Sequence, residues 1–385
     1  MIPAAIETGA YRDVAGENKL SSSDDSPSLS VNDEFELFTE GDDLYADMAA
    51  AIVAAHRSVR LESYIFADDE VGRWFAGILA EAARRGVKVW LHVDAAGSLF
   101  WGSRRFFRRL SAAGVKVRWF HRWSWRDPMR YNRRLHHKLL VVDGVRAYVG
   151  GFNIHRESSR RIVGEKRWRD THVAIRGPLA AVAAGLFDAF WRRRVNVDLP
   201  EEGTTKSKLV QNLSRAQRRD LRTIYADAFA AAGKSVFLTT PYFVPDRHTQ
   251  ELLTGAAQRG VDVRLLVPAK SDVPIAQWAA RAAYTHLLGG GVRIYEYVPR
   301  MLHAKTVVID GTWSTIGTAN LDYRSFFLNH ELTLVSRDAM LCASLEAQFY
   351  DDLEQTEEIL AVNWPRRRWP GRVLEMVGWL ARRWL

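Results

Sequence analysis

Two short stretches of the sequence place the same polar side chains at the same spacing. The first reads HHKLLVVDG over residues 136–144, and the second reads HAKTVVIDG over residues 303–311. Each is followed by a glycine and, three residues later, by an asparagine. The matching residues, each pair separated by 167 positions (303 minus 136), are His136 and His303, Lys138 and Lys305, Asp143 and Asp310, and Asn153 and Asn320.

Strand geometry would bring each histidine and its lysine to one side of the backbone. Residues two apart in a strand share a face, so His136 and Lys138 point together while His137 points away. The apolar run that follows indicates a buried strand, and the Asp–Gly pair predicts a tight turn into a second strand that carries the asparagine. Asp143 and Asp310 belong to the catalytic motif by spacing, and their position before a glycine also suits a role in the turn.

Two copies of this set facing each other could cleave and re-form a phosphodiester bond. One histidine attacks phosphorus and becomes a phosphohistidine, while the other protonates the departing alcohol and deprotonates the incoming one. The lysines and asparagines would hold the non-bridging phosphate oxygens. Because each half supplies half of the set, this chemistry requires both copies.

A catalytic histidine needs an acceptor that holds its second ring nitrogen. Asp170 lies 34 residues after His136, and Glu331 lies 28 residues after His303. Both carboxylates stand at the front of an expected strand. We therefore assign Asp170 and Glu331 as the orienting partners of the two histidines.

Further repeats predict the same fold for both halves. Apolar and helix-like segments recur in one order: SVRLESYIF (58–66) with SVFLTTPYF (235–243), AARRGVKVWLHV (82–93) with AAQRGVDVRLLV (256–267), and AGVKVRWF (113–120) with GGVRIYEY (290–297). Short apolar strands that alternate with helices favour βαβ units. We expect an α/β fold with two homologous domains, each a mostly parallel β-sheet flanked by helices, and an active site at their interface.

The expected organisation has five parts. Residues 1–33 are polar and acidic, lack the pattern of a signal peptide and are expected to be a disordered leader. The two domains span 34–200 and 216–362, joined by a polar linker over 201–215. A basic amphipathic tail occupies 363–385.

Composition restricts the partners of the protein. The 385 residues carry a net charge of +9, which favours an anionic partner, and 14 tryptophans, many beside arginine, which suit a membrane interface. A single cysteine, Cys342, excludes a disulfide within the chain. No apolar run approaches the ~20 residues that span a bilayer. The segment WFHRWSWRDPMRYNRR (119–134) is expected to touch a membrane, with a solvated basic loop as the alternative.

The paired motif resembles that of the phospholipase D superfamily, a duplicated His-x-Lys-x4-Asp followed by Gly-Ser-x-Asn or a near variant. The resemblance covers about residues 34–360, and Gly151 and Thr318 replace the serine of the variant. Within the superfamily, the segments LESYIFADDEVGRWFAGILAEAARRGVKVWLHVDAAGS and PYFVPD resemble bacterial cardiolipin synthases that lack N-terminal membrane helices.

The resemblance implies a cardiolipin synthase-type phosphatidyltransferase without a metal or nucleotide cofactor. A phosphatidyl group would pass from phosphatidylglycerol to His136 and then to the hydroxyl of a second lipid, with His303 as acid and base. The residues themselves allow the reverse order of the histidines. A phospholipase D-type hydrolase (phospholipase or nuclease) and a non-catalytic membrane-binding protein are the alternatives, and the intact motifs argue against the second of these.

The expected partners are an anionic phospholipid, phosphatidylglycerol, and an acceptor lipid, with nucleic acid disfavoured. The expected location is peripheral, on the cytoplasmic face of a bacterial cell membrane. In the tail WPRRRWPGRVLEMVGWLARRWL (364–385), apolar residues recur at helical spacing among arginines. Such a helix is too short to span a bilayer and suits its interface, while docking on the second domain is the alternative.

Overall fold

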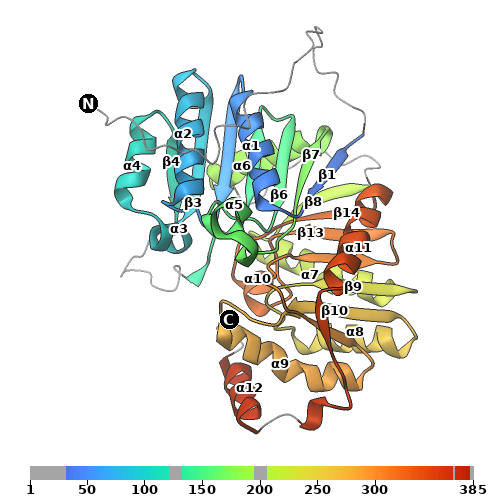
Figure 1. Cartoon of the computed structure of the whole chain (residues 1–385). Helices are drawn as coiled ribbons and strands as arrows, with labels where there is room; N and C mark the ends of the chain where they lie inside the picture. Colours follow the sequence, from blue (N-terminus) through green and yellow to red (C-terminus); the bar gives the residue numbers. More distant parts are fainter. Residues whose placement is uncertain (1–31, 122–131, 195–205, 367–368, 382–385) are drawn as a thin grey trace.

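The computed structural model describes residues 32–121, 132–194, 206–366 and 369–381. Within these ranges the chain forms two β-sheets flanked by helices, and the two halves pack against each other (Figure 1). The α/β fold with two homologous domains is therefore confirmed. Almost all of the predicted leader, and residues 122–131 of the aromatic and arginine-rich segment, lie outside the described residues.

The first domain contains a seven-stranded sheet. Its strands are β1 (Glu34–Phe38), β2 (Ser58–Ser63), β3 (Lys88–Asp94), β4 (Lys116–Phe120), β5 (Leu139–Val142), β6 (Arg146–Gly150) and β7 (His172–Arg176). Its helices are α1 (Gly41–Val53), α2 (Glu70–Arg84), α3 (Ala95–Trp101), α4 (Arg104–Ala112), α5 (Arg160–Val163) and α6 (Pro178–Trp191). The strand order is β1-β7-β6-β5-β2-β3-β4.

The second domain contains an eight-stranded sheet of order β15-β11-β10-β9-β12-β13-β14-β8. Its strands are β8 (Ser207–Gln211), β9 (Ser235–Thr239), β10 (Asp262–Pro268), β11 (Arg293–Tyr297), β12 (Thr306–Ile309), β13 (Trp313–Gly317), β14 (Leu332–Ser336) and β15 (Thr356–Ile359). Its helices are α7 (Arg215–Ala231), α8 (Arg247–Gln258), α9 (Pro274–Gly289), α10 (Tyr323–Phe327), α11 (Ala339–Leu353) and α12 (Trp369–Ala381).

Both sheets are mixed, so the expectation of mostly parallel sheets is wrong. Among the strands that the structure describes, only β2–β3–β4 and β9–β10–β11 pair in parallel, and the other neighbours are antiparallel. The reason is the motif itself, because β5 and β12 return through tight hairpins instead of crossover helices. Asp143 (φ 54°) and Asp310 (φ 55°) adopt the left-handed conformation that such turns require, with a glycine next in each.

The predicted linker is partly wrong, because Ser207–Gln211 forms β8 at the edge of the second sheet, antiparallel to β14. Ser207, Leu209 and Gln211 are buried, while the side chains between them are more exposed. This strand carries polar residues on both faces, and its composition therefore reads as a loop. Residues 206–215 belong to the second domain, and 201–205 lie outside the described residues.

The sequence signals for helix ends agree with the structure. The Asp69 side chain accepts a hydrogen bond from the Gly72 N–H and caps α2, a role that aspartate commonly takes at the start of a helix. Gly86 (φ 89°) and Gly260 (φ 90°) follow α2 and α8 in a conformation that favours glycine. These stops direct the chain into β3 and β10.

One apolar cluster is shared by the two sheets. It joins Val149 of β6 and Ile175 of β7 to Val308 of β12 and Leu334 of β14, with Phe187 of α6 beside them. Each of these side chains is almost fully buried. The sheets therefore dock through a common core, which fixes the position of one motif relative to the other.

The tail helix α12 lies along α9 (Figure 1). A Cβ on Gly378 would lie 2.4 Å from the backbone nitrogen of Ala279, so the two helices approach closely there. Glu375 and Gly378 are buried, whereas Met376 and Leu380 are 58% and 69% exposed. The helix is docked by its small and polar side and turns apolar side chains outward. Among the described residues, no helix combines the length and the apolar composition that crossing a membrane requires.

Candidate active site

The two motif histidines line a single cavity of about 370 Å³ between the domains. Asn153 and Asn320 line the same cavity, so the two copies of the motif converge as expected. Three aromatic side chains flank the imidazoles. The Tyr64 ring lies 5.2 Å from that of His136, and Trp168 and Tyr242 lie 5.1 and 6.3 Å from that of His303.

Each histidine is held by a carboxylate of the opposite domain. His136 Nδ1 donates to Glu331 Oε2 at 2.8 Å, and His303 Nδ1 donates to Asp170 Oδ2 at 2.5 Å. Both carboxylates are buried. The distances along the sequence would pair each histidine with the carboxylate of its own half, and the structure exchanges these partners.

Backbone pairing between the domains produces this exchange. The His136 N–H donates to the His330 carbonyl at 2.9 Å, and the His303 N–H donates to the Arg169 carbonyl at 2.7 Å. Short parallel bridges, Leu135 with His330 and Arg169 with Leu302, extend both contacts. Each histidine thus lies beside the residue that precedes the opposite carboxylate.

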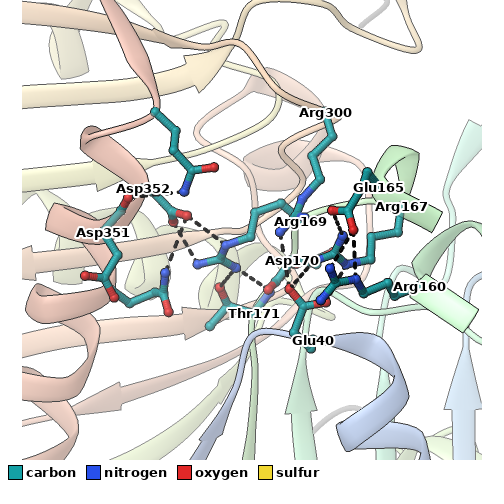
Figure 2. Close-up of polar contacts among 12 residues, drawn as sticks. Glu40, Arg160, Glu165, Arg167, Arg169, Asp170, Thr171, Arg300, Asp351 and Asp352 are labelled. Atoms are coloured by element: carbon teal, nitrogen blue, oxygen red, sulfur yellow. Dashed lines mark hydrogen bonds and ion pairs between the residues drawn. The ribbon is translucent and has the colours of Figure 1, made fainter.

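A buried ion pair anchors the segment that carries Asp170 (Figure 2). Arg169 Nε and Nη2 donate to the two carboxylate oxygens of Asp352 on α11 at 2.8 and 2.7 Å. Arg169 also donates to the Asp170 carbonyl and, at 3.0 Å, to Thr171 Oγ1. Such bidentate geometry fixes both position and orientation. The second domain therefore holds Asp170 in place beside His303.

The motif lysines are buried close to the histidines. Lys138 Nζ donates to the His136 carbonyl at 3.1 Å, and Lys305 Nζ lies 2.9 Å from His303 Nδ1. Burial, with repulsion from Lys305 next in size, lowers the pKa of Lys138 to about 7. Burial lowers the pKa of Lys305 to about 8. Their ammonium groups are poorly solvated, which prepares them for an anion.

The imidazoles are neutral bases in this environment. Burial lowers the pKa of His136 to about 4, although Glu331 opposes the shift. Burial and then Lys305 lower the pKa of His303. Burial raises the pKa of Glu331, but His136 and the other donors outweigh it, so the carboxylate stays ionised. With Nδ1–H directed at a carboxylate, Nε2 carries the lone pair of each ring.

The asparagines differ in their contacts. Asn153 Oδ1 accepts from the Ile65 N–H at 3.1 Å, and this bond sets the direction of the amide Nδ2. Asn320 is 4% exposed and lines the cavity near Asp322, whose pKa burial raises to about 6. Both amides lie where they could donate to a phosphate oxygen.

The motif aspartates lie away from the cavity, which corrects their grouping with the catalytic residues. The Asp143 carboxylate accepts from the backbone N–H groups of His56, Arg57 and Ser58. The Asp310 carboxylate does the same with three successive residues, Gly233, Lys234 and Ser235. Each aspartate thus ties its hairpin to the start of β2 or β9, which is the turn role that its position before glycine suits.

The two residues that replace the serine of the motif act differently. Thr318 Oγ1 donates to Glu331 Oε2 at 2.6 Å and helps to hold that carboxylate. A Cβ on Gly151 would lie 1.9 Å from Asp170 Oδ1. The Asp170 carboxylate therefore occupies the space of a side chain at position 151, and the glycine is required there.

Some neighbouring residues have structural roles. His137 turns away from the cavity, as expected, and its Nδ1 donates to Glu62 Oε2 at 2.7 Å, while His92 contacts the other oxygen of Glu62. Sequence reasoning did not identify Tyr64, Trp168 or Arg134 as cavity residues. No hydrophobic periodicity and no motif spacing in the sequence marks these three positions as part of a site.

A duplicated His–Lys–Asn set at the interface of two α/β domains is the architecture of a phospholipase D-like protein. Residues 48–191 and 225–353 match the family model "Cardiolipin synthase, PLD-like domain", so the chain belongs to this family. This agrees with the resemblance seen in the motifs and with the predicted class of enzyme, a phosphatidyltransferase of the phospholipase D superfamily.

Two relatives cover most of the chain. The sequence is 34% identical to cardiolipin synthase A of Pseudomonas fluorescens over 92% of this chain and 75% of that protein. It is 31% identical to the probable cardiolipin synthase YwiE of Bacillus subtilis over 88% and 70%. The crystal structure of phosphatidylserine synthase from Haemophilus influenzae Rd KW20 matches with a TM-score of 0.71 over 91% of this chain and 95% of that one. At 15% identity, that likeness concerns the fold.

Proposed function

We propose that the protein makes cardiolipin by moving a phosphatidyl group from phosphatidylglycerol to the hydroxyl of a second lipid, with release of glycerol. The observation that carries the proposal is the pair of histidines in one cavity, each with Nδ1 bonded to a buried carboxylate of the opposite domain. The similarity to cardiolipin synthases supports this choice of substrates.

The geometry suits two successive displacements at phosphorus. His136 Nε2 attacks the phosphodiester, and the bond to the glycerol oxygen breaks as His303 delivers a proton to it. The second lipid hydroxyl then loses its proton to His303 and attacks the phosphohistidine, which restores His136. Glu331 and Asp170 stabilise the cationic imidazole in turn, and the bound phosphate diester raises the proton affinity of His303 and of both lysines.

Product analysis tests this function. Purified protein receives phosphatidylglycerol vesicles with a chelator and without nucleotide. Cardiolipin and glycerol in equal amounts support the transferase, whereas phosphatidic acid alone supports a hydrolase. Release of nucleotides from DNA with the lipid untouched would contradict both.

A trapping experiment tests the covalent step. Label from a phosphatidyl-labelled donor should appear on His136 in a quenched reaction, in an acid-labile and alkali-stable form. Label on His303 instead would exchange the two roles. Absence of label after rapid quenching would favour direct transfer between lipids.

Peripheral contact with an anionic membrane is part of the proposal. The outward apolar side of α12 and the exposed Phe100 of α3 suit insertion among headgroups, and the net charge of +9 favours anionic lipid. Leu380→Asp should weaken sedimentation with phosphatidylglycerol vesicles severalfold. Val298→Asp, at an exposed residue of the loop after β11, is the matched control. Equal binding by the two variants would assign attachment elsewhere.

A further inference from the structure

The catalytic groups of the two halves are related by pseudo-symmetry, but the donor lipid and the acceptor lipid of a transfer reaction play different roles at the site. Every 167-residue pair at the reaction centre is identical, namely the two histidines, the two lysines and the two asparagines. The donor phosphate lies between the histidines. An acceptor such as phosphatidylglycerol carries its own phosphate a glycerol unit away from the attacking hydroxyl. The cavity must therefore accommodate a second negative charge to one side.

The same register identifies where the cavity departs from symmetry. Arg134 precedes His136 by two residues, and its counterpart before His303 is Met301. Arg324 follows Asn320 by four residues, and its counterpart after Asn153 is Glu157. Both arginines line the cavity, and neither counterpart is among its described lining residues. These two departures thus place positive charge in the cavity at positions whose counterparts in the other half are not among its described lining residues.

The two arginines are fixed on neighbouring segments. Arg324 on α10 donates to the carbonyl oxygen of Asn132 at 2.9 Å and to the Asn132 Oδ1 at 3.0 Å. Asn132 lies two residues before Arg134 in the chain. Arg134 is 6% exposed and donates to the His121 carbonyl at 3.3 Å. Its Nη1 lies 3.4 Å from Asp94. These contacts hold the guanidinium groups in place before a ligand arrives.

Asp94 does not remove Arg134 from consideration as a phosphate ligand. Its carboxylate accepts shorter hydrogen bonds from the backbone N–H groups of Ala96 and Leu135, at 2.8 Å each, and one from Gly97 at 3.1 Å. The 3.4 Å contact with Arg134 is longer than a good charge-assisted hydrogen bond. Asp94 therefore acts mainly on the backbone and positions the arginine electrostatically.

We propose that Arg134 and Arg324, which both line the cavity, form a subsite for the phosphodiester of the acceptor lipid. This inference rests on the proposed function. A planar guanidinium can bind two oxygens of a phosphate at once, and a buried one does so without competition from water. The subsite selects an acceptor that carries an anionic phosphate over a neutral alcohol.

A competition for one intermediate tests the subsite. Phosphatidylglycerol vesicles with added n-butanol offer two acceptors to the same phosphohistidine, so the ratio of cardiolipin to phosphatidylbutanol depends on the acceptor step alone. Arg134→Met installs the residue that the other half carries. It should lower the ratio by about tenfold or more, as loss of a buried charge-assisted contact implies. Arg134→Lys, which keeps a charge, should give an intermediate ratio.

Arg300→Met is the matched control, because Arg300 is a partly buried interface arginine that binds Glu40 and is not among the described lining residues (Figure 2). Its ratio should equal that of the wild type. If Arg134→Met lowers both products by the same factor, the arginine is structural and the subsite is refuted. If the wild type forms phosphatidic acid or phosphatidylbutanol but no cardiolipin, the proposed function itself fails, which is a different outcome.

Discussion

Each carboxylate holds the histidine of the opposite domain. Asp170→Asn should therefore impair protonation of the leaving group by His303, whereas Glu331→Gln should impair the attack of His136 on phosphorus. Asp170 lies 2.5 Å from His303 Nδ1 and is buried, so the variant removes the charge that stabilises a protonated His303. Breaking a buried pair by removing one charge costs about 3–5 kcal/mol, which corresponds to about 10²–10⁴ in rate. A glycerol alkoxide needs the proton of His303, but a p-nitrophenolate leaves without it.

Two donors separate these effects in rapid-quench assays of the first turnover. One is phosphatidylglycerol and the other is its analogue with p-nitrophenol in place of the headgroup glycerol. Asp170→Asn should lose most of its rate with the first donor and less than about tenfold with the second. Glu331→Gln should lose rate with both. The ratio of the two rates cancels any change in phosphate binding. An equal ratio in both variants would refute the crossed assignment, and a reversed pattern would exchange the roles of the histidines.

Further predictions concern stability and pH. Lys138→Met should abolish turnover yet raise the free energy of unfolding by about 2–4 kcal/mol at pH 7, because a lysine whose pKa falls to about 7 on folding destabilises the folded state. Since this cost is absent above the unfolded pKa and grows as pH falls, the gain in Tm should shrink toward pH 10, and a constant gain would contradict it. A non-cleavable phosphonate analogue of the donor should bind more weakly above pH 8, because Lys138 and Lys305 lose their protons. Calorimetry should show the affinity falling about tenfold per pH unit for each of the two lysines. Asp310→Ala should lower stability by about 1–3 kcal/mol with kcat nearly unchanged, since it removes three backbone hydrogen bonds outside the cavity, and collapse of kcat at constant Tm would oppose this. His136→Ala and His303→Ala should each abolish turnover, with the double variant little worse, and a tenth of wild-type activity in either would remove that histidine from the mechanism.

Local signals in the sequence predicted local structure well. The predicted Asp–Gly turns after the two apolar strands depend on neighbouring residues alone, and both are present. The repeated motif predicted the convergence of both histidines, because two half-sets in the same register complete one site only when they face each other. Strand direction was harder, since a short apolar strand carries no mark of its pairing partner.

Long-range pairing accounts for the features of the site that the sequence did not reveal. Asp170 and Glu331 were identified as orienting residues from their position before strands, but their exchange depends on backbone contacts between domains. The cavity wall formed by Trp168 and Arg134 has no spacing signal. Comparison of the two halves could have found the arginine, because its counterpart in the second half is Met301.

The exchange of carboxylates also bears on how such a protein could arise. A single copy of the unit would hold a histidine and a carboxylate that cannot serve each other, so it would be inert until two copies joined as a symmetric pair. In such a pair, every substitution appears on both sides of the cavity at once. Joining the copies in one chain makes each position independent. Arg134 can then differ from Met301, and a centre built by repetition can treat two substrates differently.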